Sequence, residues 1–297
     1  MRPTQKSLFR VLHALRYAEP QGLPRTGTPP SWPRRPQRRN IQDVAKVIAV
    51  SSAKGGVGKS TVAANLSVAF ARLGLRSGIL DADVFGPSIP NLFDLSGEPR
   101  LSSNNQLLPL TNYGVKTMSL GYLVGEKSAL VWRGPMVIKA IQQLLHQVEW
   151  GGLDILVLDL PPGTGDVQLT ITQQVILDGS VIVTTPHSLA TRDAVKGISM
   201  FRTVDVNILG LVQNMSLYNC PHCHTQSHIF GSDQIVKSMC KEHDMDLLGD
   251  VPLHPTACRE GDRPKLVVVS DPSSDIASVF MKIAQAICHK INLPADY

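Results

Sequence analysis

The sequence predicts an α/β protein built on a doubly wound, mostly parallel sheet. Short apolar segments that are typical of buried strands, such as 47–50 and 154–159, alternate with segments whose apolar residues recur every three or four positions. This alternation favours a parallel sheet with helices on both faces. Several of the strands also run directly into glycine-rich or acidic loops, which is where the ligand crevice of such a sheet lies.

The chain has 297 residues, 43% of them hydrophobic, which is enough for one α/β domain with extensions. The expected elements, in order, are a strand at 47–50, a helix at 62–73, strands at 77–80 and 115–118, a helix at 134–148, strands at 154–159 and 181–184, a helix at 189–202, strands at 208–212 and 247–252, and a helix at 276–291. We expect a domain at 40–297, with an insert near 216–231, behind a leader at 1–39.

A phosphate-binding loop is predicted at 54–61, Lys-Gly-Gly-Val-Gly-Lys-Ser-Thr, between the first strand and the first helix. Glycines let backbone N–H groups face a phosphate, and the helix N-terminus adds its positive end. The residues expected to bind ATP here are Gly55, Gly56, Val57, Gly58, Lys59, Ser60 and Thr61. Lys59 is expected to reach the β- and γ-phosphates, and Ser60 to bind Mg²⁺.

Acidic residues follow two further strands at the same predicted edge. Asp83 is our first choice for orienting the attacking water and Asp81 our second, although Asp and Gly-Pro also punctuate ordinary loops. Asp159 ends the buried strand at 154–159 and is expected to bind Mg²⁺ through water. The loop at 161–166, rich in Pro and Gly, follows at once and is expected to sense hydrolysis through its backbone N–H groups.

Cys220 and Cys223 form a Cys-Pro-His-Cys pair, and paired thiolates at this spacing bind zinc or iron–sulfur clusters. One pair is half a site, because both centres normally take four ligands. Two completions stay open: a local zinc site with His224 and His228, or two subunits that each supply two cysteines. A thioredoxin-like redox pair is disfavoured, because the pair does not stand between a strand and a helix start.

The leader differs in charge from the rest of the chain. Residues 1–39 hold nine basic residues and one acidic residue, which leaves a formal charge of −3 for 40–297. An amphipathic, acid-poor start followed by Pro- and Arg-rich chain is typical of a mitochondrial transit peptide. The alternative is a basic tail that binds nucleic acid. The −3 body lacks the charge pattern of a nucleic-acid-binding protein.

No run of 18 apolar residues occurs, so we expect no membrane span and at most peripheral membrane contact. Five cysteines in a chain of this length do not indicate a disulfide scaffold and suit a reducing compartment. Cys240, Cys258 and Cys288 are isolated, and we expect no ligand role for them; Cys288 falls in a helix pattern as a packing residue.

The two lysines of the loop, Lys54 and Lys59, resemble the deviant Walker A loop of the partition, Min and nitrogenase-iron-protein group of P-loop ATPases. This resemblance implies a homodimer in which Lys54 reaches the nucleotide of the neighbouring subunit, and it assigns the catalytic roles to Lys54, Lys59 and Asp83. Asn214 matches the residue that reads adenine in that group, although an Asx turn is the plainer alternative.

The motifs at 54–61, 81–87, 132–136, 159–166, 213–215 and 220–223 stand in the order found in the Mrp/ApbC family of iron–sulfur cluster carrier ATPases, which the chain resembles from about residue 43 to its end. The resemblance implies a homodimer with a [4Fe–4S] cluster bridged by the two cysteine pairs, delivery of that cluster to apo-proteins, and slow ATP hydrolysis as a switch. The leader favours the mitochondrial branch, which implies the matrix as location and subunits of respiratory complex I as clients.

Three other functions fit parts of the pattern. A Min- or partition-type positioning ATPase with a structural zinc site shares the loop, but it would use a membrane helix or a basic DNA face. A small-molecule ligase of the dethiobiotin-synthetase kind shares the fold and has no need of the cysteine pair. A nucleotide-binding module without turnover also fits, because sequence does not give rates.

Overall fold

The computed structural model describes residues 38–123, 134–220, 222–223, 225–232, 234–253 and 266–294, which belong to one compact unit. The predicted leader lies outside the described residues except for its last two positions, and so do Trp132, His224 and Cys258. Expectations for the leader therefore stay predictions.

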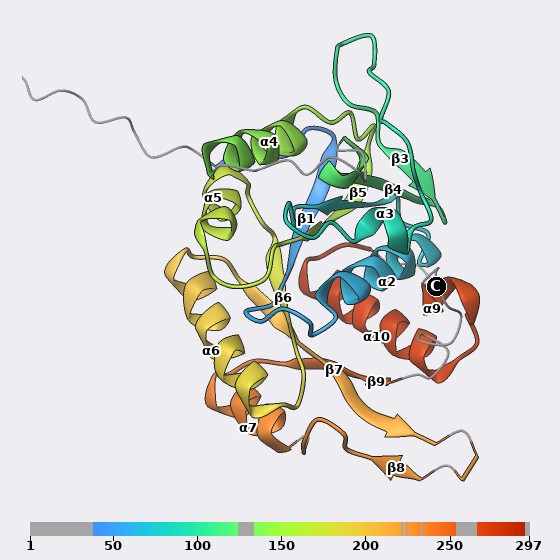
Figure 1. Ribbon diagram of the computed structural model, residues 1–297, viewed down its shortest axis with the longest axis vertical. Helices are drawn as coiled ribbons and strands as arrows, with labels where there is room; N and C mark the ends of the chain where they lie inside the picture. Colours follow the sequence, from blue (N-terminus) through green and yellow to red (C-terminus); the bar gives the residue numbers. More distant parts are fainter. Residues whose placement is uncertain are drawn as a thin grey trace, which may run out of the picture. The chain divides into compact units, whose positions relative to one another are not determined.

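A nine-stranded sheet forms the centre of this unit (Figure 1). Its strands are β1 Val44–Ser51, β2 Ser77–Asp81, β3 Leu110–Asn112, β4 Val115–Ser119, β5 Leu153–Asp159, β6 Gly179–Thr184, β7 Ile208–Asn219, β8 Gln226–Ser227 and β9 Leu247–Leu253. The order is β3-β4-β2-β5-β1-β6-β7-β8, and β9 also pairs with β7. All pairs are parallel except β3 with β4 and β7 with β8, which confirms the mostly parallel sheet.

Helices cover both faces of the sheet (Figure 1). They are α2 Lys59–Arg72, α3 Ile89–Leu92, α4 Gly134–His146, α5 Asp166–Gln174, α6 Ser188–Thr203, α7 Gln234–Glu242, α9 Val267–Ser270 and α10 Asp275–Lys290, with a 3₁₀ turn, η1, at Leu120–Tyr122. Helices α2, α3, α9 and α10 pack on one face, and α4 to α7 pack on the other. The doubly wound architecture is therefore confirmed.

The sheet has an apolar core on each face, which explains why the sequences of the central strands are continuously apolar. In β1, Ile48 and Val50 pack on the α2 side, whereas Val47 and Ala49 pack on the α4–α7 side. Successive side chains of a strand point to opposite faces, so a strand buried on both faces needs an apolar residue at every position. All four residues are at most 4% exposed.

The strand register brings the chemical groups to one edge. Val50 of β1 lies opposite Asp159 of β5, and Asp81 of β2 lies opposite Asp159 on its other side. The backbone N–H of Ala82 then donates to the carbonyl oxygen of Asp159 at 2.9 Å. The loops after β1, β2 and β5 therefore start at the same level, at the carboxyl edge of the sheet.

The structure differs from the sequence expectations in the length of β7 and in several short elements. β7 continues to Asn219 instead of ending at 212, so the expected insert near 216–231 begins as an extension of a central strand. α5 and α7 were not predicted, because each has only nine residues, with three or four apolar side chains, which is too short for a clear helical pattern.

No helix in the described part of the chain has the length and apolarity that a membrane crossing needs.

Candidate nucleotide site and cysteine hairpin

The loop at 54–61 has the backbone geometry that a phosphate site requires. Gly56 and Gly58 have positive φ angles of 80° each, a conformation that residues with a Cβ rarely adopt. α2 starts directly afterwards at Lys59, with no acidic residue in its first turn and no side chain capping its N-terminal N–H groups. These donors are therefore free for an anion. The loop borders a cavity of about 490 Å³, which Asp83, Ser88 and Pro162 line from the opposite side.

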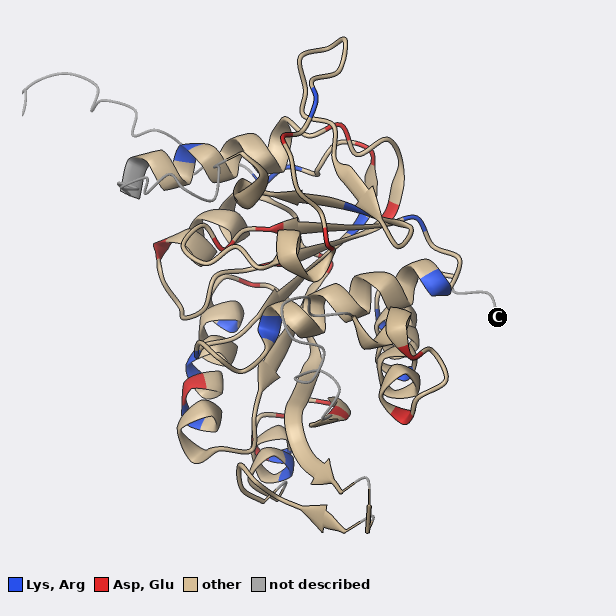
Figure 2. Ribbon diagram, turned by 45° about the vertical axis from the view of Figure 1, so that its right-hand side comes forward, with Lys and Arg blue, Asp and Glu red and all other residues tan. Residues whose placement is uncertain are grey.

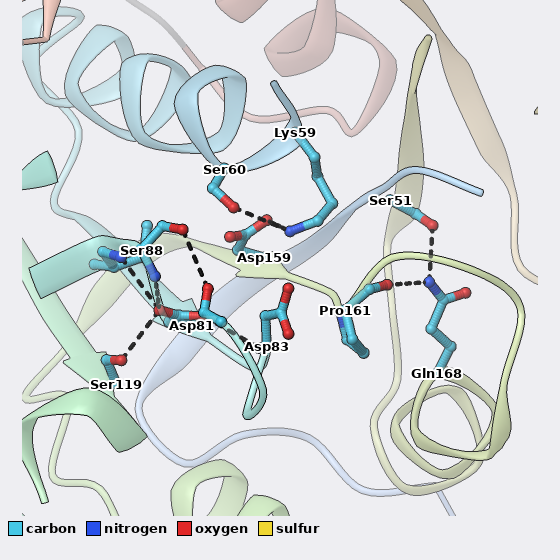
Figure 3. A network of polar contacts seen from close by, with 12 residues as sticks. Ser51, Lys59, Ser60, Asp81, Asp83, Ser88, Ser119, Asp159, Pro161 and Gln168 are labelled. Atoms are coloured by element: carbon cyan, nitrogen blue, oxygen red, sulfur yellow. Dashed lines mark hydrogen bonds and ion pairs between the residues drawn. The ribbon is translucent and has the colours of Figure 1, made fainter. Parts of the chain in front are cut away.

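Lys59 and Asp159 form a buried ion pair at the floor of this site (Figure 3). Lys59 Nζ contacts the carboxylate of Asp159, and it also donates to Ser60 Oγ at 3.2 Å. Lys59 is 6% exposed and Asp159 fully buried. In this conformation the loop lysine neutralises the acid at the end of β5. A phosphate bound in the loop would compete with Asp159 for this lysine, so phosphate binding and release of the carboxylate would be linked.

The residues beside the ion pair fit Mg²⁺. Oδ2 of Asp159 is buried and has no hydrogen-bond partner among the described residues. Ser60 Oγ lies next to it through their shared contact with Lys59 (Figure 3). A carboxylate and a hydroxyl are the hard oxygen donors that Mg²⁺ prefers, and Mg²⁺ keeps several water ligands of its own. Ser60 and Asp159 are therefore the residues that could hold the ion beside a bound phosphate.

Asp81 organises the loop that follows β2. It accepts hydrogen bonds from the backbone N–H groups of Asp83, Ser88 and Ile89, at 3.1 to 3.2 Å, and from Ser119 Oγ at 3.1 Å (Figure 3). Its burial, and secondly the charge of Asp159, raise the pKa of Asp81 to about 7. Because its oxygens are occupied by the loop, Asp81 is placed to position residues 82–89 rather than a water molecule.

Asp83 lies at the cavity that Asp81 helps to shape. Its side chain lines the space between the phosphate loop and Pro162. Burial is the largest cause that raises the pKa of Asp83, and Lys59 acts against it. The structure thus brings our first choice for the water-orienting residue to the site, and that role stays a prediction. Lys54 is half-buried in the same loop, and its predicted reach into a neighbouring subunit stays a prediction too.

The loop after β5 is tied to the start of the phosphate loop. The backbone N–H of Gly163 donates to the carbonyl oxygen of Ser52 at 2.9 Å. Gln168 Nε2, on α5, donates to the carbonyl oxygen of Pro161 at 2.5 Å and to Ser51 Oγ at 3.4 Å (Figure 3). The sequence analysis missed Gln168. The signal that could have found it is an amide on the helix that opens directly after a glycine-rich loop.

Asn214 meets the phosphate loop from β7. Its Nδ2 donates to the carbonyl oxygen of Val57 at 2.8 Å, and the residue is 8% exposed. A Cβ at Gly58 would lie 2.3 Å from Asn214 Nδ2, so the loop needs glycine there for a second reason. The structure brings Asn214 to the nucleotide site as expected. Its amide nitrogen is engaged by the protein itself, and adenine reading stays a prediction.

The cysteine pair lies at the end of β7, on a hairpin that projects from the sheet (Figure 1). Cys220 is half-buried and Cys223 exposed. The backbone N–H of Cys220 donates to the carbonyl oxygen of Thr225 at 3.1 Å, and Cys223 Sγ lies 3.2 Å from Thr225 Oγ1. Hydrogen bonding with the Thr225 side chain, then its backbone, and then Cys220 lowers the pKa of Cys223 to about 7. A substantial fraction of this thiol is therefore the metal-binding thiolate at neutral pH.

The described residues of the hairpin do not form a complete metal centre by themselves. Within the described residues, no three His, Cys, Asp or Glu side chains are grouped in a way that could hold a metal ion. His228 is exposed, and His224 is outside the described residues, so the local zinc alternative stays untested. Two thiols at an exposed tip offer half of a four-ligand site.

The other two cysteines that the structure describes, Cys240 and Cys288, are buried. Burial raises the pKa of Cys288 to about 11, and burial is also the main cause that raises the pKa of Cys240. Cys288, on α10, packs in the core on the α2 side of the sheet, in agreement with its expected packing role.

Lys and Arg are interspersed with Asp and Glu along the elements rather than gathered in one patch in the view of Figure 2.

Over most of its length, the chain is similar in sequence to proteins named for iron–sulfur cluster transfer. Residues 43–288 match a family described as "ParA: NUBPL iron-transfer P-loop NTPase". The mouse iron–sulfur cluster transfer protein NUBPL is 50% identical over 258 residues, 86% of this chain and 81% of that protein. An Arabidopsis thaliana "iron-sulfur protein required for NADH dehydrogenase, mitochondrial" is 46% identical over 83% of this chain and 79% of its own length.

Solved structures agree with this assignment. A nucleotide-binding protein from Archaeoglobus fulgidus in complex with ADP is 35% identical, with a TM-score of 0.69 over 81% of this chain and 94% of the other. The MinD cell division ATPase of Pyrococcus furiosus, with a TM-score of 0.58 over 82% of this chain and 98% of its own, is 20% identical and shares the fold alone. By sequence and fold, the chain belongs to the NUBPL iron-transfer P-loop NTPase family.

Proposed function

We propose that this chain is an ATP-dependent carrier that binds a [4Fe–4S] cluster through Cys220 and Cys223 and delivers it to apo-proteins. The observation that supports it most directly is the exposed thiol of Cys223, whose pKa is lowered to about 7, beside Cys220 on a projecting hairpin. An exposed thiol with a lowered pKa, next to a second thiol, suits a ligand that must be released to another protein. The relatives are named as iron–sulfur cluster transfer and carrier proteins, which agrees with this proposal.

The nucleotide site supplies the control. The phosphate loop and the N-terminus of α2 would bind the phosphates, and Lys59 would exchange Asp159 for the β- and γ-phosphates. Ser60 and Asp159 would hold Mg²⁺, which supplies charge neutralisation at the transferred phosphoryl group. Asp83 would orient the water. Hydrolysis would be slow, so that nucleotide acts as a switch.

The cluster is proposed to lie between two copies of the chain. One copy offers two thiols, and a cubane cluster normally takes four. Lys54 is proposed to approach the nucleotide of the second copy, as its place in the loop implies. The clients are proposed to include subunits of respiratory complex I in the mitochondrial matrix, after cleavage of the leader within 1–39. The name of the Arabidopsis relative, required for mitochondrial NADH dehydrogenase, supports that choice.

Anaerobic reconstitution of the chain with iron and sulfide tests the proposal. We expect a brown dimer with about four irons per two chains, measured by absorption, metal analysis and sizing. Cys223→Ser is expected to lose the cluster while ADP binding stays unchanged. Cys240→Ala is the matched control, because it removes a thiol that is buried away from the hairpin. A full cluster in the Cys223 variant would contradict the bridging proposal.

A colourless protein with tightly bound zinc would instead support the rival function, a Min- or partition-type positioning ATPase. That rival rests on likeness to solved structures near 20% identity, which share the fold alone. No residue described above favours it over cluster transfer.

A further inference from the structure

One strand touches both sites. β7 contacts the phosphate loop at Asn214, and six residues later the chain reaches Cys220. The contact is close: besides the 2.8 Å hydrogen bond to the Val57 carbonyl oxygen, a Cβ at Gly58 would lie 3.6 Å from Met215 Cε. A shift of the loop backbone at Val57 therefore breaks this hydrogen bond or moves Asn214, and Met215 follows Asn214 in the chain.

The strand bends at this contact. Met215 has a φ of 54°, in the left-handed region that residues with a side chain rarely adopt. The register with β9 also breaks here. Asn214 lies opposite Val251 and the next pair is Tyr218 with Leu253, so β7 advances four positions while β9 advances two. Extra residues and a strained φ mark a place where a strand changes direction.

Gln213, the residue before Asn214, lacks hydrogen-bond partners for its side chain within the described part of the chain. Gln213 is fully buried, and neither Nε2 nor Oε1 has a hydrogen-bond partner among the described residues. A buried amide without hydrogen bonds raises the free energy of the conformation in which it occurs. Two independent features, the left-handed Met215 and the unpartnered Gln213, therefore make an alternative path of β7 accessible at the point where it touches the loop.

Beyond the bend, the cysteines follow β7. β8 pairs with β7 alone, through Tyr218 with Ser227 and Asn219 with Gln226. Figure 1 shows this hairpin as a projection from the sheet, away from the helices that cover its faces. Beyond Met215, β7 keeps one register pair with β9, Tyr218 with Leu253, so a change of direction at Met215 would turn the hairpin about that pair.

We infer that the bend at Met215 is a hinge through which nucleotide in the phosphate loop sets the orientation of Cys220 and Cys223. Loop backbone that closes on phosphate displaces the Val57 carbonyl group, Asn214 follows it, and Met215 converts the shift into a rotation of the hairpin. Met215 and Gln213 act here as positioning residues and touch neither nucleotide nor metal. The inference rests on the proposed function for its purpose, but the coupling itself exists in the metal-free chain.

The test measures cysteine alkylation in the reduced, metal-free full-length protein. Iodoacetamide modification of Cys220 and Cys223 is followed by peptide mass spectrometry with and without Mg–ADP, and ADP binding is measured separately. In the wild type, we expect ADP to change the rate at Cys220 by about threefold or more. Cys240 and Cys288, which are buried, serve as internal controls whose rates should stay constant.

Met215→Gly is the informative variant. Glycine adopts a φ of 54° without strain and removes the side chain that lies beside Gly58, so the hairpin should move independently of the nucleotide. We expect ADP affinity within about twofold of the wild type, and the ADP effect on Cys220 to disappear. Asp205→Gly is the matched control: it makes the same change at a φ of 54°, at an exposed turn before β7 and away from the loop.

The outcomes separate the hinge from the proposed function. ADP binding without any change at Cys220 in the wild type would overturn the hinge and leave the nucleotide site intact. A full ADP effect in Met215→Gly would also overturn it, and would indicate that the cysteines sense nucleotide in another way, such as coverage by a second copy. Failure to bind ADP at all would overturn both.

Discussion

The phosphate loop and the cysteine hairpin are held in opposite ways. The loop is fixed from three directions: Lys59 reaches Asp159 of β5, Ser52 accepts from Gly163 of the next loop, and Val57 accepts from Asn214 of β7. In the hairpin, β8 is held by two register pairs with β7, β7 beyond Met215 has one register pair with β9, and every described residue within 222–230 is exposed. Many convergent contacts suit a site that recognises one small ligand the same way each time.

Sparse attachment suits a site that must meet other proteins. The thiol chemistry follows the same division: burial raises the pKa of Cys288 to about 11, whereas local hydrogen bonds lower that of the exposed Cys223 to about 7. The comparison indicates that the nucleotide site depends on the whole sheet, while the hairpin depends on its own few contacts and on β7. Substitutions in the nucleotide site should therefore change ADP affinity and the free energy of unfolding strongly, whereas substitutions in the hairpin should change only the chemistry of its own thiols.

The largest effect is expected for Lys59→Met. ADP affinity should fall by roughly 100-fold, because a charge-assisted phosphate contact is lost. The free energy of unfolding should fall by about 3 kcal/mol as well, since Asp159 is left buried without its partner. Urea unfolding and ADP titration measure the two losses. Lys59→Met with Asp159→Asn should regain most of the stability and none of the affinity. Equal stability of the single and double variants would contradict the buried-pair interpretation.

A smaller effect concerns the pH dependence set by Asp81. A carboxyl whose pKa rises on folding binds more protons in the folded state than in the unfolded state between the two pKa values, here from about 4 to about 7. The free energy of unfolding of the ligand-free protein should therefore fall as pH rises through this range. Relative to Asp81→Asn, the wild type should lose about 2–3 kcal/mol between pH 5 and pH 7. Equal pH slopes in urea unfolding would show that Asp81 titrates normally.

These two residues also show what the sequence could predict. The phosphate loop at 54–61 is local: strand, glycines, lysine and helix follow one another, so their geometry follows from their order. Asp81 and Asp159 were placed at the same edge because each ends a buried strand, and the register confirms this. The pairing of Lys59 with Asp159 spans 100 residues and needed the fold. So did the loop-organising role of Asp81, because Ser119 reaches it from β4.

The sequence predicts chemistry for the hairpin but not its geometry. The Cys-x-x-Cys spacing predicts a soft-metal site, which stays a prediction, whereas the extension of β7 to Asn219 and the return strand β8 were missed. β8 has two residues, and its neighbours provide no alternating pattern. The lowered pKa of Cys223 depends on that return, because it brings Thr225 back to the sulfur.

A third prediction tests how the glycine-rich loop after β5 is anchored. Gln168→Leu should lower the free energy of unfolding by about 1–2 kcal/mol, because the carbonyl oxygen of Pro161 and Ser51 Oγ lose their donor inside the protein. Urea unfolding measures the loss. Gln173→Leu, at an exposed position of α5, is the matched control and should change stability by less than about 0.5 kcal/mol. Similar losses in both variants would assign the effect to the helix and not to the anchor.

The smallest effect is expected on the hairpin, for Thr225→Val. The valine keeps the shape and removes the hydroxyl that hydrogen-bonds to Cys223, so the pKa of that thiol should rise from about 7 toward its ordinary range near 8.5. The pH midpoint of iodoacetamide alkylation measures it: the rate at pH 7 should fall several-fold and converge with the wild type above about pH 9. Thr225→Ser keeps the hydroxyl and should retain the midpoint near 7. Neither variant should change ADP binding or the free energy of unfolding, because Thr225 is exposed and belongs to neither core of the sheet. A shifted midpoint in both variants would show that the Thr225 hydroxyl does not set the pKa of Cys223, and lost ADP binding in either would show that the nucleotide site depends on the local contacts of the hairpin.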